Sequence, residues 1–212
     1  AAIFWRSFTH WIGGMGVLVF LLAVVQMSGG SSINLMKSES PGPSVGKLVP
    51  KMKHTARILY FIYLALTVLE VILLVCGDMP LFEALATSFG TAGTGGFGIR
   101  GDSIAGYSDT LQWIVTVFMI LFGINFNFYY YLLFRQFRKA LGMQEVRAYL
   151  LIILASVGFI TLNIRHLAGG LFRALTQAAF QVASIITTTG FATTDFNQWP
   201  EASKTILVML MF

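Results

Sequence analysis

The segment TTTGFATTD occupies residues 187–195 and places three threonines, a glycine and an aromatic residue in a row within a very apolar chain. The interior of a membrane excludes polar side chains and irregular backbone unless these line a wet path or are buried in protein. A segment of the same kind, TGGFG at residues 94–98, lies 94 positions before its counterpart TTGFA. This pair of segments decides the fold that we expect.

The chain around these segments has the composition of an integral membrane protein. Its 212 residues are 56% hydrophobic and 11% charged, whereas soluble domains carry about a quarter charged residues. Several apolar runs approach the roughly 20 residues that cross a bilayer as a helix. These runs occupy residues 11–27, 58–75, 111–134 and 149–162. We therefore expect an all-α membrane protein in contact with lipid.

The cations gather in two loops. Residues 28–57 hold five Lys or Arg against one Glu, and residues 135–147 hold four against one Glu. The loop between them, residues 77–109, holds one Arg against four carboxylates. By the positive-inside rule the two basic loops are cytoplasmic and the loop between them is external. Topology thus accounts for the net charge of +5, and no nucleic-acid partner is expected.

This topology predicts five membrane helices, at residues 4–27, 56–76, 110–134, 148–162 and 202–212. The last has about eleven residues, fewer than the roughly 20 of a span, so we expect the chain to be part of a longer protein. Two shorter apolar runs, residues 81–89 and 171–184, have both ends outside and the length of re-entrant helices.

The two re-entrant runs and the loops that follow them are copies. ALATSFGTAGTGGF (residues 84–97) aligns without gaps with AAFQVASIITTTGF (residues 178–191). Parallel repeats of this kind pack around an axis along the membrane normal. We expect residues 1–30 to be the second helix of a first repeat, 31–55 a cytoplasmic linker, 56–135 a second repeat, 136–147 a linker, and 148–212 a third repeat as far as the start of its second helix.

The repeated core has the residue types of a cation selectivity filter. Glycine reaches backbone angles that turn successive carbonyls the same way, and rings of such carbonyls replace the hydration shell of a cation. The aromatic residue is expected to pack outward, and the short helix directs its negative end at the pore. The expected cation-binding residues are Thr94, Gly95, Gly96, Thr188, Thr189 and Gly190, with Thr91, Thr187, Phe97 and Phe191 as secondary candidates.

Other interpretations remain open from the residues alone. Residues 93–98 match G-x-G-x-x-G but open no βαβ unit, so a dinucleotide site or other organic cofactor is not expected. Glu70 in mid-span is either a proton or cation site or a carboxyl that is buried neutral or hydrogen-bonded. A membrane enzyme would need converging acid and base groups, and His10, His54 and His166 lie far apart in the topology. A non-conducting scaffold is a further alternative.

Several polar residues flank the expected filters. Asn125 and Asn127 are expected to bond across helices or to brace a filter loop from behind. Asp102 and Asp195, six and five residues beyond the filter glycines, either concentrate cations at the mouth or are solvated loop carboxylates.

Aromatic residues and glycines mark the ends of the expected spans. The pairs at residues 5–6 (Trp-Arg) and 10–11 (His-Trp) are expected to anchor the first helix at the membrane interface. The three tyrosines at residues 129–131 are expected to form an aromatic belt near the cytoplasm. The GGMG segment at residues 13–16 is expected to allow a close helix contact.

In combination these motifs resemble the Trk/Ktr/HKT superfamily of potassium transporters. FWRS and WIGGMG resemble the segment after the first pore loop of that family, and ESPGP resembles its first cytoplasmic linker. GGF and TTGF fall where its second and third filters lie, and DF followed by WP resembles the end of the third loop. These motifs begin at residues 4, 11, 39, 95, 188, 195 and 199.

The resemblance implies four helix–pore-loop–helix repeats arranged pseudo-fourfold around one central pore. It implies transport of K+ across the bacterial inner membrane, by a channel-like or a symport mechanism, with a less selective Na+ and K+ pathway as the alternative. It also implies a homodimer on a cytosolic ring of nucleotide-binding regulatory proteins. The first and fourth filters, and a gating loop, would lie outside residues 1–212.

Overall fold

The computed structural model describes residues 2–14 and 52–211, and all regular structure within these ranges is helical. This confirms the expected all-α fold class. The ESPGP segment, most of the first linker and the second half of the expected first helix lie outside the described residues. The helices are α1 (Ala2–Gly14), α4 (Met52–Cys76), α5 (Leu81–Ala92), α6 (Asp109–Gly123), α7 (Phe126–Leu133), α8 (Phe137–Gly142), α9 (Gln144–Ile164), α10 (Leu171–Ile186), the 3-10 turn η1 (Phe196–Gln198) and α11 (Glu201–Met209).

Within residues 2–14 and 52–211, two single helices are long and apolar enough to cross a membrane, α4 over residues 57–76 and α9 over its whole length. Only 28% of the most apolar window of α4 and 33% of that of α9 are buried inside the protein. The remaining side chains are largely exposed Leu, Ile, Val and Phe. A helix that is apolar on its exposed side suits lipid rather than water, which supports an integral membrane protein.

The prediction of one continuous helix at residues 110–134 is wrong. The segment is divided into α6 and α7, which meet at an angle of 89°. The break has a chemical cause: Gly123 is a poor helix former, and the side-chain oxygen of Asn125 accepts the N–H of Asn127 at 3.0 Å, starting a new helix. Across the break, the Tyr129 hydroxyl donates to the Leu121 carbonyl near the end of α6 at 2.6 Å.

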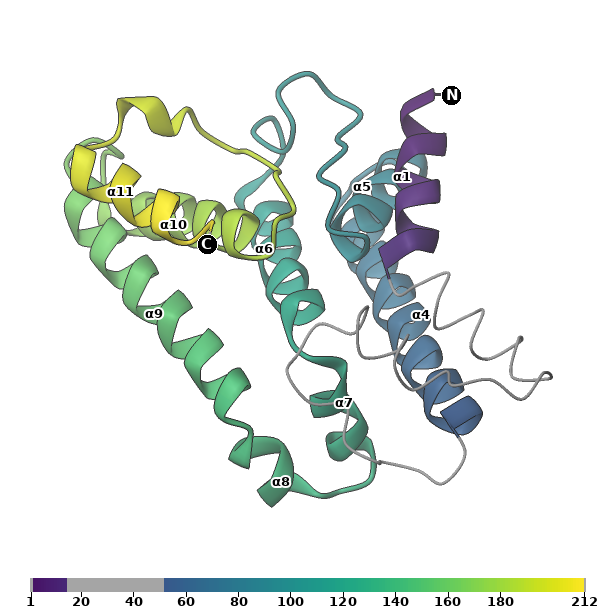
Figure 1. Ribbon diagram of the computed structural model, residues 1–212. Coiled ribbons are helices and arrows are strands. Elements are labelled where there is room, and N and C mark those ends of the chain that lie inside the picture. Colours follow the sequence, from purple (N-terminus) through teal and green to yellow (C-terminus); the bar gives the residue numbers. More distant parts are fainter. Residues whose placement is uncertain (1, 15–51, 212) are drawn as a thin grey trace.

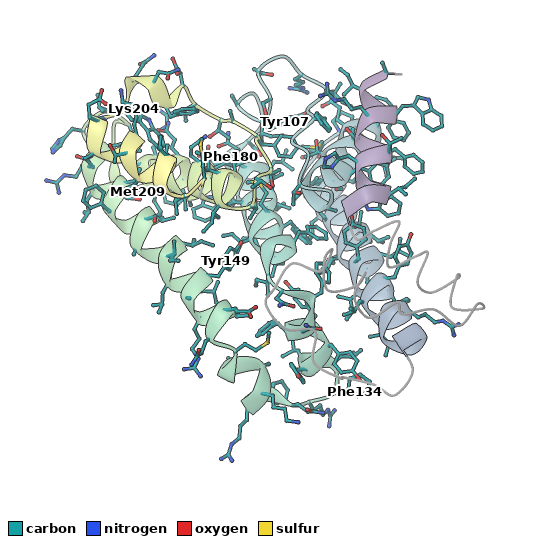
Figure 2. All side chains as sticks on the ribbon, in the orientation of Figure 1. Tyr107, Phe134, Tyr149, Phe180, Lys204 and Met209 are labelled. Atoms are coloured by element: carbon teal, nitrogen blue, oxygen red, sulfur yellow. The ribbon has the colours of Figure 1, made fainter. Side chains whose placement is uncertain are left out.

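A second tyrosine supports the same break from a neighbouring helix. The hydroxyl of Tyr149 on α9 donates to the carbonyl of Ile120 at 3.3 Å, and Figure 2 shows Tyr149 in the space between α9 and α6. Irregular backbone at membrane depth is tolerated where side chains satisfy its polar groups. Because Tyr129 bonds α6 and Tyr130 is buried against α4, the expected interfacial belt of tyrosines is wrong for these two residues.

The expected sidedness of the loops agrees with the arrangement of the helices. Figure 1 shows α8 and the first residues of α4 and α9 at one end of the molecule, and the loops that follow α5 and α10 at the other end. The exposed cations Arg135, Arg138 and Lys139 belong to the end with α8. Both short helices therefore enter from the acidic side and return to it, as expected of re-entrant helices.

The short helices α5 and α10 have equivalent neighbours. α5 packs against α1 and α4, whereas α10 packs against α6 and α9. In terms of the sequence repeats, each short helix contacts the first helix of its own repeat and the second helix of the repeat before it. This common relation positions the two loops that follow α5 and α10.

Candidate cation pathway

The backbone of the loop after α5 is repeated in the loop after α10. In the first loop the N–H groups of Gly95 and Gly96 both donate to the carbonyl of Gly90, at 2.8 and 3.3 Å. The second loop repeats both bonds, at 2.9 and 3.3 Å, with Ser184 as the acceptor. Since a backbone pattern that recurs 94 residues later reflects the same local fold, the alignment of the two segments is confirmed in three dimensions.

The alternation of backbone conformation also recurs. Thr94 and Gly96 have φ of 55° and 63°, and Thr188 and Gly190 have φ of 56° and 86°. The residue between each pair is not left-handed. A β-branched residue with positive φ is a conformational outlier, and such strain concentrates at functional sites. Both loops therefore hold a threonine in the same unfavourable conformation, at positions that correspond in the repeat.

Most of the expected ligand carbonyls have no competing hydrogen bond. In residues 2–14 and 52–211, no donor bonds the main-chain oxygens of Thr94, Gly95, Thr188, Thr189 or Gly190. In contrast, the carbonyl of Gly96 accepts the N–H of Gly98 at 3.1 Å. Free carbonyl oxygens are the groups with which a filter replaces the water of a cation.

The two loops meet. A side chain added to Gly96 would collide with the carbonyl oxygen of Thr189 and would lie 2.9 Å from the carbonyl carbon of Gly190. Just beyond the filters, Ala192 donates its N–H to the Ser103 hydroxyl at 3.2 Å and accepts the N–H of Ile104 at 3.2 Å. The two loops are therefore in direct contact and are bonded to each other just beyond the expected filter residues.

The two filter aromatics pack outward as expected. Phe191 is 0% exposed and joins the hydrophobic core that includes residues of α4, α5 and α6. Its ring lies 3.0 Å from where a Cβ on Gly90 would be. Phe97 lies against α1 instead, with the Arg6 guanidinium 4.0 Å above its ring. Each aromatic thus contacts the repeat that precedes its own and supports the loop from behind.

The polar residues of α1 belong to the filter surroundings. His10 lies edge-on to Phe97 with ring centroids 5.4 Å apart, and the Ser7 hydroxyl donates to the Phe97 carbonyl at 3.3 Å. The indole of Trp11 donates to the Thr67 hydroxyl at 3.2 Å. Both side chains thus contact protein, but His10 remains exposed and Trp11 is only partly buried, so the role of this pair as an interfacial anchor stays a prediction. Sequence reasoning missed these contacts, since nothing local links α1 to a loop 90 residues away.

The GGMG segment behaves as expected only in part. A Cβ on Gly14 would lie 2.8 Å from the Cα of Gly93 and 2.9 Å from the Tyr63 hydroxyl, so this glycine does allow a close contact between α1 and the base of the first loop. Gly13 has no such neighbour within 4 Å among the residues that the structure describes. The other two residues of the segment lie outside the described residues.

The secondary threonine candidates are held by their own helices. The Thr91 hydroxyl donates to the Thr87 carbonyl at 2.9 Å, and the Thr187 hydroxyl donates to the Ala183 carbonyl at 2.7 Å. Thr187 also pairs with the Thr189 hydroxyl at 2.7 Å. The side chains of Thr91 and Thr187 therefore support the pore helices and the base of the loop.

The outer residues have identifiable partners. Asp195 accepts the N–H of Asn197 at 3.1 Å, which caps η1 and favours its interpretation as a loop carboxylate. Arg100 pairs with Glu83 at 3.0 Å, and Tyr107 also donates to Glu83. Partial burial and this hydrogen bond raise the pKa of the Tyr107 phenol above its ordinary value. Sequence reasoning missed this cluster.

Two further expectations concern the interior. The side-chain amide of Asn125 donates to the Glu145 carboxylate on α9 at 3.1 Å, which confirms a bond across helices. Asn127 contributes its main-chain N–H to the cap of α7. Among the described residues, no three His, Cys, Asp or Glu side chains are grouped as metal ligands.

The class of protein follows from comparison with known families. Residues 1–171 match the TrkH family, which is described as a cation transport protein. The chain therefore belongs to the TrkH family of cation transport proteins. This is a family of membrane transporters rather than of enzymes, so the alternative of a membrane enzyme is set aside.

Individual relatives agree with this assignment. The chain is 33% identical over 218 residues to the Trk system potassium uptake protein TrkH of Salmonella typhimurium, and it covers 45% of that protein. It is 31% identical over 216 residues to the Trk system potassium uptake protein TrkG of Escherichia coli K12, of which it covers 44%. All of this chain is aligned in both cases. The chain thus spans less than half the length of these relatives.

A solved structure has the same fold. The crystal structure of the potassium transporter TrkH from Vibrio parahaemolyticus superposes with a TM-score of 0.79 at 29% identity. The superposition covers 99% of this chain and 43% of that one. Together with the family match, this confirms the resemblance that the filter motifs indicated.

Proposed function

We propose that this chain forms two adjacent quarters of a K+ pathway, as part of the membrane subunit of a Trk-type potassium uptake system. The observation that carries the proposal is the contact between two loops of the same backbone geometry, where Gly96 meets the carbonyl of Thr189. The unbonded carbonyls of Thr94, Gly95 and Thr188 lie in these same loops. The relatives named above are potassium uptake proteins, which makes K+ the proposed ion.

The physical basis is replacement of water by protein oxygen. A K+ ion that enters between the loops exchanges its hydration shell for main-chain carbonyls. The C-terminal ends of α5 and α10, at Ala92 and Ile186, precede the loops directly and add the negative end of a helix dipole, about 0.3–1 kcal/mol each. Since no carboxylate is required as a ligand, the ion leaves as readily as it enters.

The arrangement of the loops fits a cyclic pore. Phe97 contacts the second helix of the repeat before it, and Phe191 contacts the corresponding α6. A relation that is repeated from one unit to the next generates a ring if the rotation closes. We propose that four such units surround one pore, with repeats bounded at residues 56–135 and 148–212 in this chain.

The surroundings of the subunit follow from the same proposal. The exposed cations Arg135, Arg138 and Lys139 lie at the end with α8, which we place in the cytoplasm of a bacterial inner membrane. This surface would dock a cytosolic nucleotide-binding regulatory ring, consistent with relatives that are named as components of a system. The complete subunit is proposed to pair as a homodimer within the lipid.

Potassium uptake by cells that lack their own uptake systems tests the proposal, using the complete gene. Gly96→Ser and Gly190→Ser should each reduce K+ uptake or its preference over Na+, because both positions have positive φ within the filter. Gly101→Ser is the control, since nothing lies within 4 Å of a Cβ there. Unchanged uptake and selectivity in both filter variants would refute the filter assignment, and equal transport of Na+ and K+ by the wild type would identify a less selective cation pathway.

A further inference from the structure

Glu70 is the buried group that the proposed pathway leaves unexplained. It lies in the middle of α4, its side chain is 0% exposed, and neither of its carboxyl oxygens has a hydrogen-bond partner among the described residues. Buried polar groups are nearly always bonded, and an unbonded one destabilises the fold by the cost of its desolvation. The surroundings of Glu70 should therefore contain groups with which it bonds.

The surface of α5 that faces Glu70 carries such groups. Leu74 of α4 shares a hydrophobic core with Ala84 of α5, and Tyr63 shares another with Ala92. Because the two helices are antiparallel, Glu70 falls between these contacts, opposite the central part of α5. That part contains Thr87, Ser88 and Thr91, all of which are buried.

Two hydroxyls on this surface are suitable partners. The Ser88 hydroxyl is 0% exposed and, like the carboxyl, has no partner in the part of the chain that the structure describes. The Thr91 hydroxyl, on the same part of α5, already donates its hydrogen to the Thr87 carbonyl at 2.9 Å. A bond between Glu70 and Thr91 therefore requires the carboxyl to be the donor, since the threonine oxygen retains only acceptor capacity.

The charges nearby do not favour an ionised carboxylate. The described residues provide Glu70 with no ion pair, and Arg100 is paired with Glu83 outside the helix contact. Burial of an unpaired charge is more costly than burial of a neutral group that forms hydrogen bonds. Hydrogen bonding rather than charge is thus the role that this position supports.

The third repeat contains an internal comparison. The position that aligns with Ser88 at the offset of 94 is Val182, which is 0% exposed. Val182 belongs to a hydrophobic core with Ile153 and Ile160 of α9. At this position the pore helix of the third repeat therefore packs in an apolar core, whereas the pore helix of the second repeat carries a buried hydroxyl.

We propose that Glu70 is a positioning residue for the second filter. Its carboxyl holds α5 against α4 by hydrogen bonds to the hydroxyls of Ser88 and Thr91, and thereby fixes the loop that begins at Gly93. Glu70 itself does not touch the ion. The predicted effect of Glu70 on ion selectivity rests on the proposed function. The predicted polar contact between α4 and α5 does not depend on that function.

The test measures K+ uptake and K+ over Na+ preference of the complete protein in cells that lack other uptake systems, together with its membrane abundance and its thermal unfolding in detergent. Glu70→Gln keeps the shape and a hydrogen-bond donor, so it should retain both uptake and selectivity. Glu70→Leu should lower the preference for K+ by about tenfold, since it removes the carboxyl that is proposed to bond the hydroxyls of α5. Thr161→Val is the control, because it removes another buried unpartnered hydroxyl, from α9.

A double variant keeps the test decisive if Glu70→Leu is poorly produced. Combining Glu70→Leu with Ser88→Val makes the contact apolar, as in the third repeat, and should recover unfolding temperature and selectivity relative to Glu70→Leu alone. Unchanged selectivity in Glu70→Leu, equal losses in Glu70→Gln and Glu70→Leu, or no recovery in the double variant would each overturn the inference.

The same assay separates this inference from the proposed function. Wild type and Gly190→Ala are measured alongside the other variants. If these two proteins do not differ in ion preference, the filter assignment itself is wrong. The Glu70 contact is then judged by unfolding temperature, where the double variant should still exceed Glu70→Leu. If Gly190→Ala is impaired while Glu70→Leu is normal, only the inference about Glu70 is wrong.

Discussion

Three glycines with positive φ allow the filter geometry to be tested against backbone strain. Gly96, Gly169 and Gly190 have φ of 63°, 73° and 86°. An alanine in the left-handed region costs about 1–2 kcal/mol. Each substitution to alanine therefore carries a similar conformational cost, but only two of the three positions lie in the proposed filters.

The surroundings of the three glycines predict different outcomes. Nothing lies within 4 Å of a Cβ on Gly169 or on Gly190, so these variants experience the conformational cost alone. That cost shifts the population of the native loop by about 5- to 30-fold. A Cβ on Gly96 would also collide with the Thr189 carbonyl. We therefore expect Gly96→Ala to be the most damaging, since the third filter must move as well.

The assay is the rate of K+ uptake with competing Na+, in cells expressing the complete gene, combined with thermal unfolding in detergent with and without K+. Gly169→Ala should lower the unfolding temperature without changing ion preference. Gly190→Ala should weaken ion preference and K+-dependent stabilisation, and Gly96→Ala should weaken both further. The reasoning would be refuted if all three variants had the same ion preference, or if Gly169→Ala changed ion preference more than the two filter variants do.

Other side chains around the loops give further predictions. Gly123→Ala should reduce K+ uptake several-fold at matched abundance, because its Cβ would collide with the Tyr149 hydroxyl and lie 2.8 Å from the Thr187 methyl group at the base of the third filter. Ser184→Ala removes a 2.6 Å bond to the Phe191 carbonyl and should destabilise the protein by about 1 kcal/mol, measured by thermal unfolding. The pKa of Tyr107 is raised in the folded protein. Its contribution to the free energy of unfolding should therefore be present below the ordinary tyrosine pKa of 10.0 and be lost at higher pH. Tyr107→Phe should show a smaller fall in unfolding temperature over the same pH range.

Local sequence patterns were sufficient to predict the class of protein and its repeated unit. Long apolar runs with few charges identify membrane helices by their composition, and the shared TGGF and TTGF cores identify the two loops. The re-entrant runs expected at residues 81–89 and 171–184 correspond to α5 and α10, which extend to Ala92 and Ile186. These features depend on neighbouring residues, so one sequence contains the necessary information.

Features that depend on distant residues could not be predicted in this way. The apolar run at residues 110–134 contains no proline, and its division at Gly123 becomes evident only with the tyrosine hydroxyls that bond carbonyls near the end of α6. The contacts of Arg6 and His10 with Phe97 join segments about 90 positions apart. The positive φ of the filter threonines opposes the preference of β-branched residues, so tertiary structure must impose it.

Localisation of a bound ion tests the central claim most directly. Crystals of the complete protein grown with Tl+, whose anomalous scattering marks K+ sites, should show density between the two loops, within coordination distance of the main-chain oxygens of Thr94, Gly95, Thr188 and Thr189. Competition by K+ should remove that density. Tl+ located only elsewhere, or the two loops separated by lipid in the complete protein, would contradict the account.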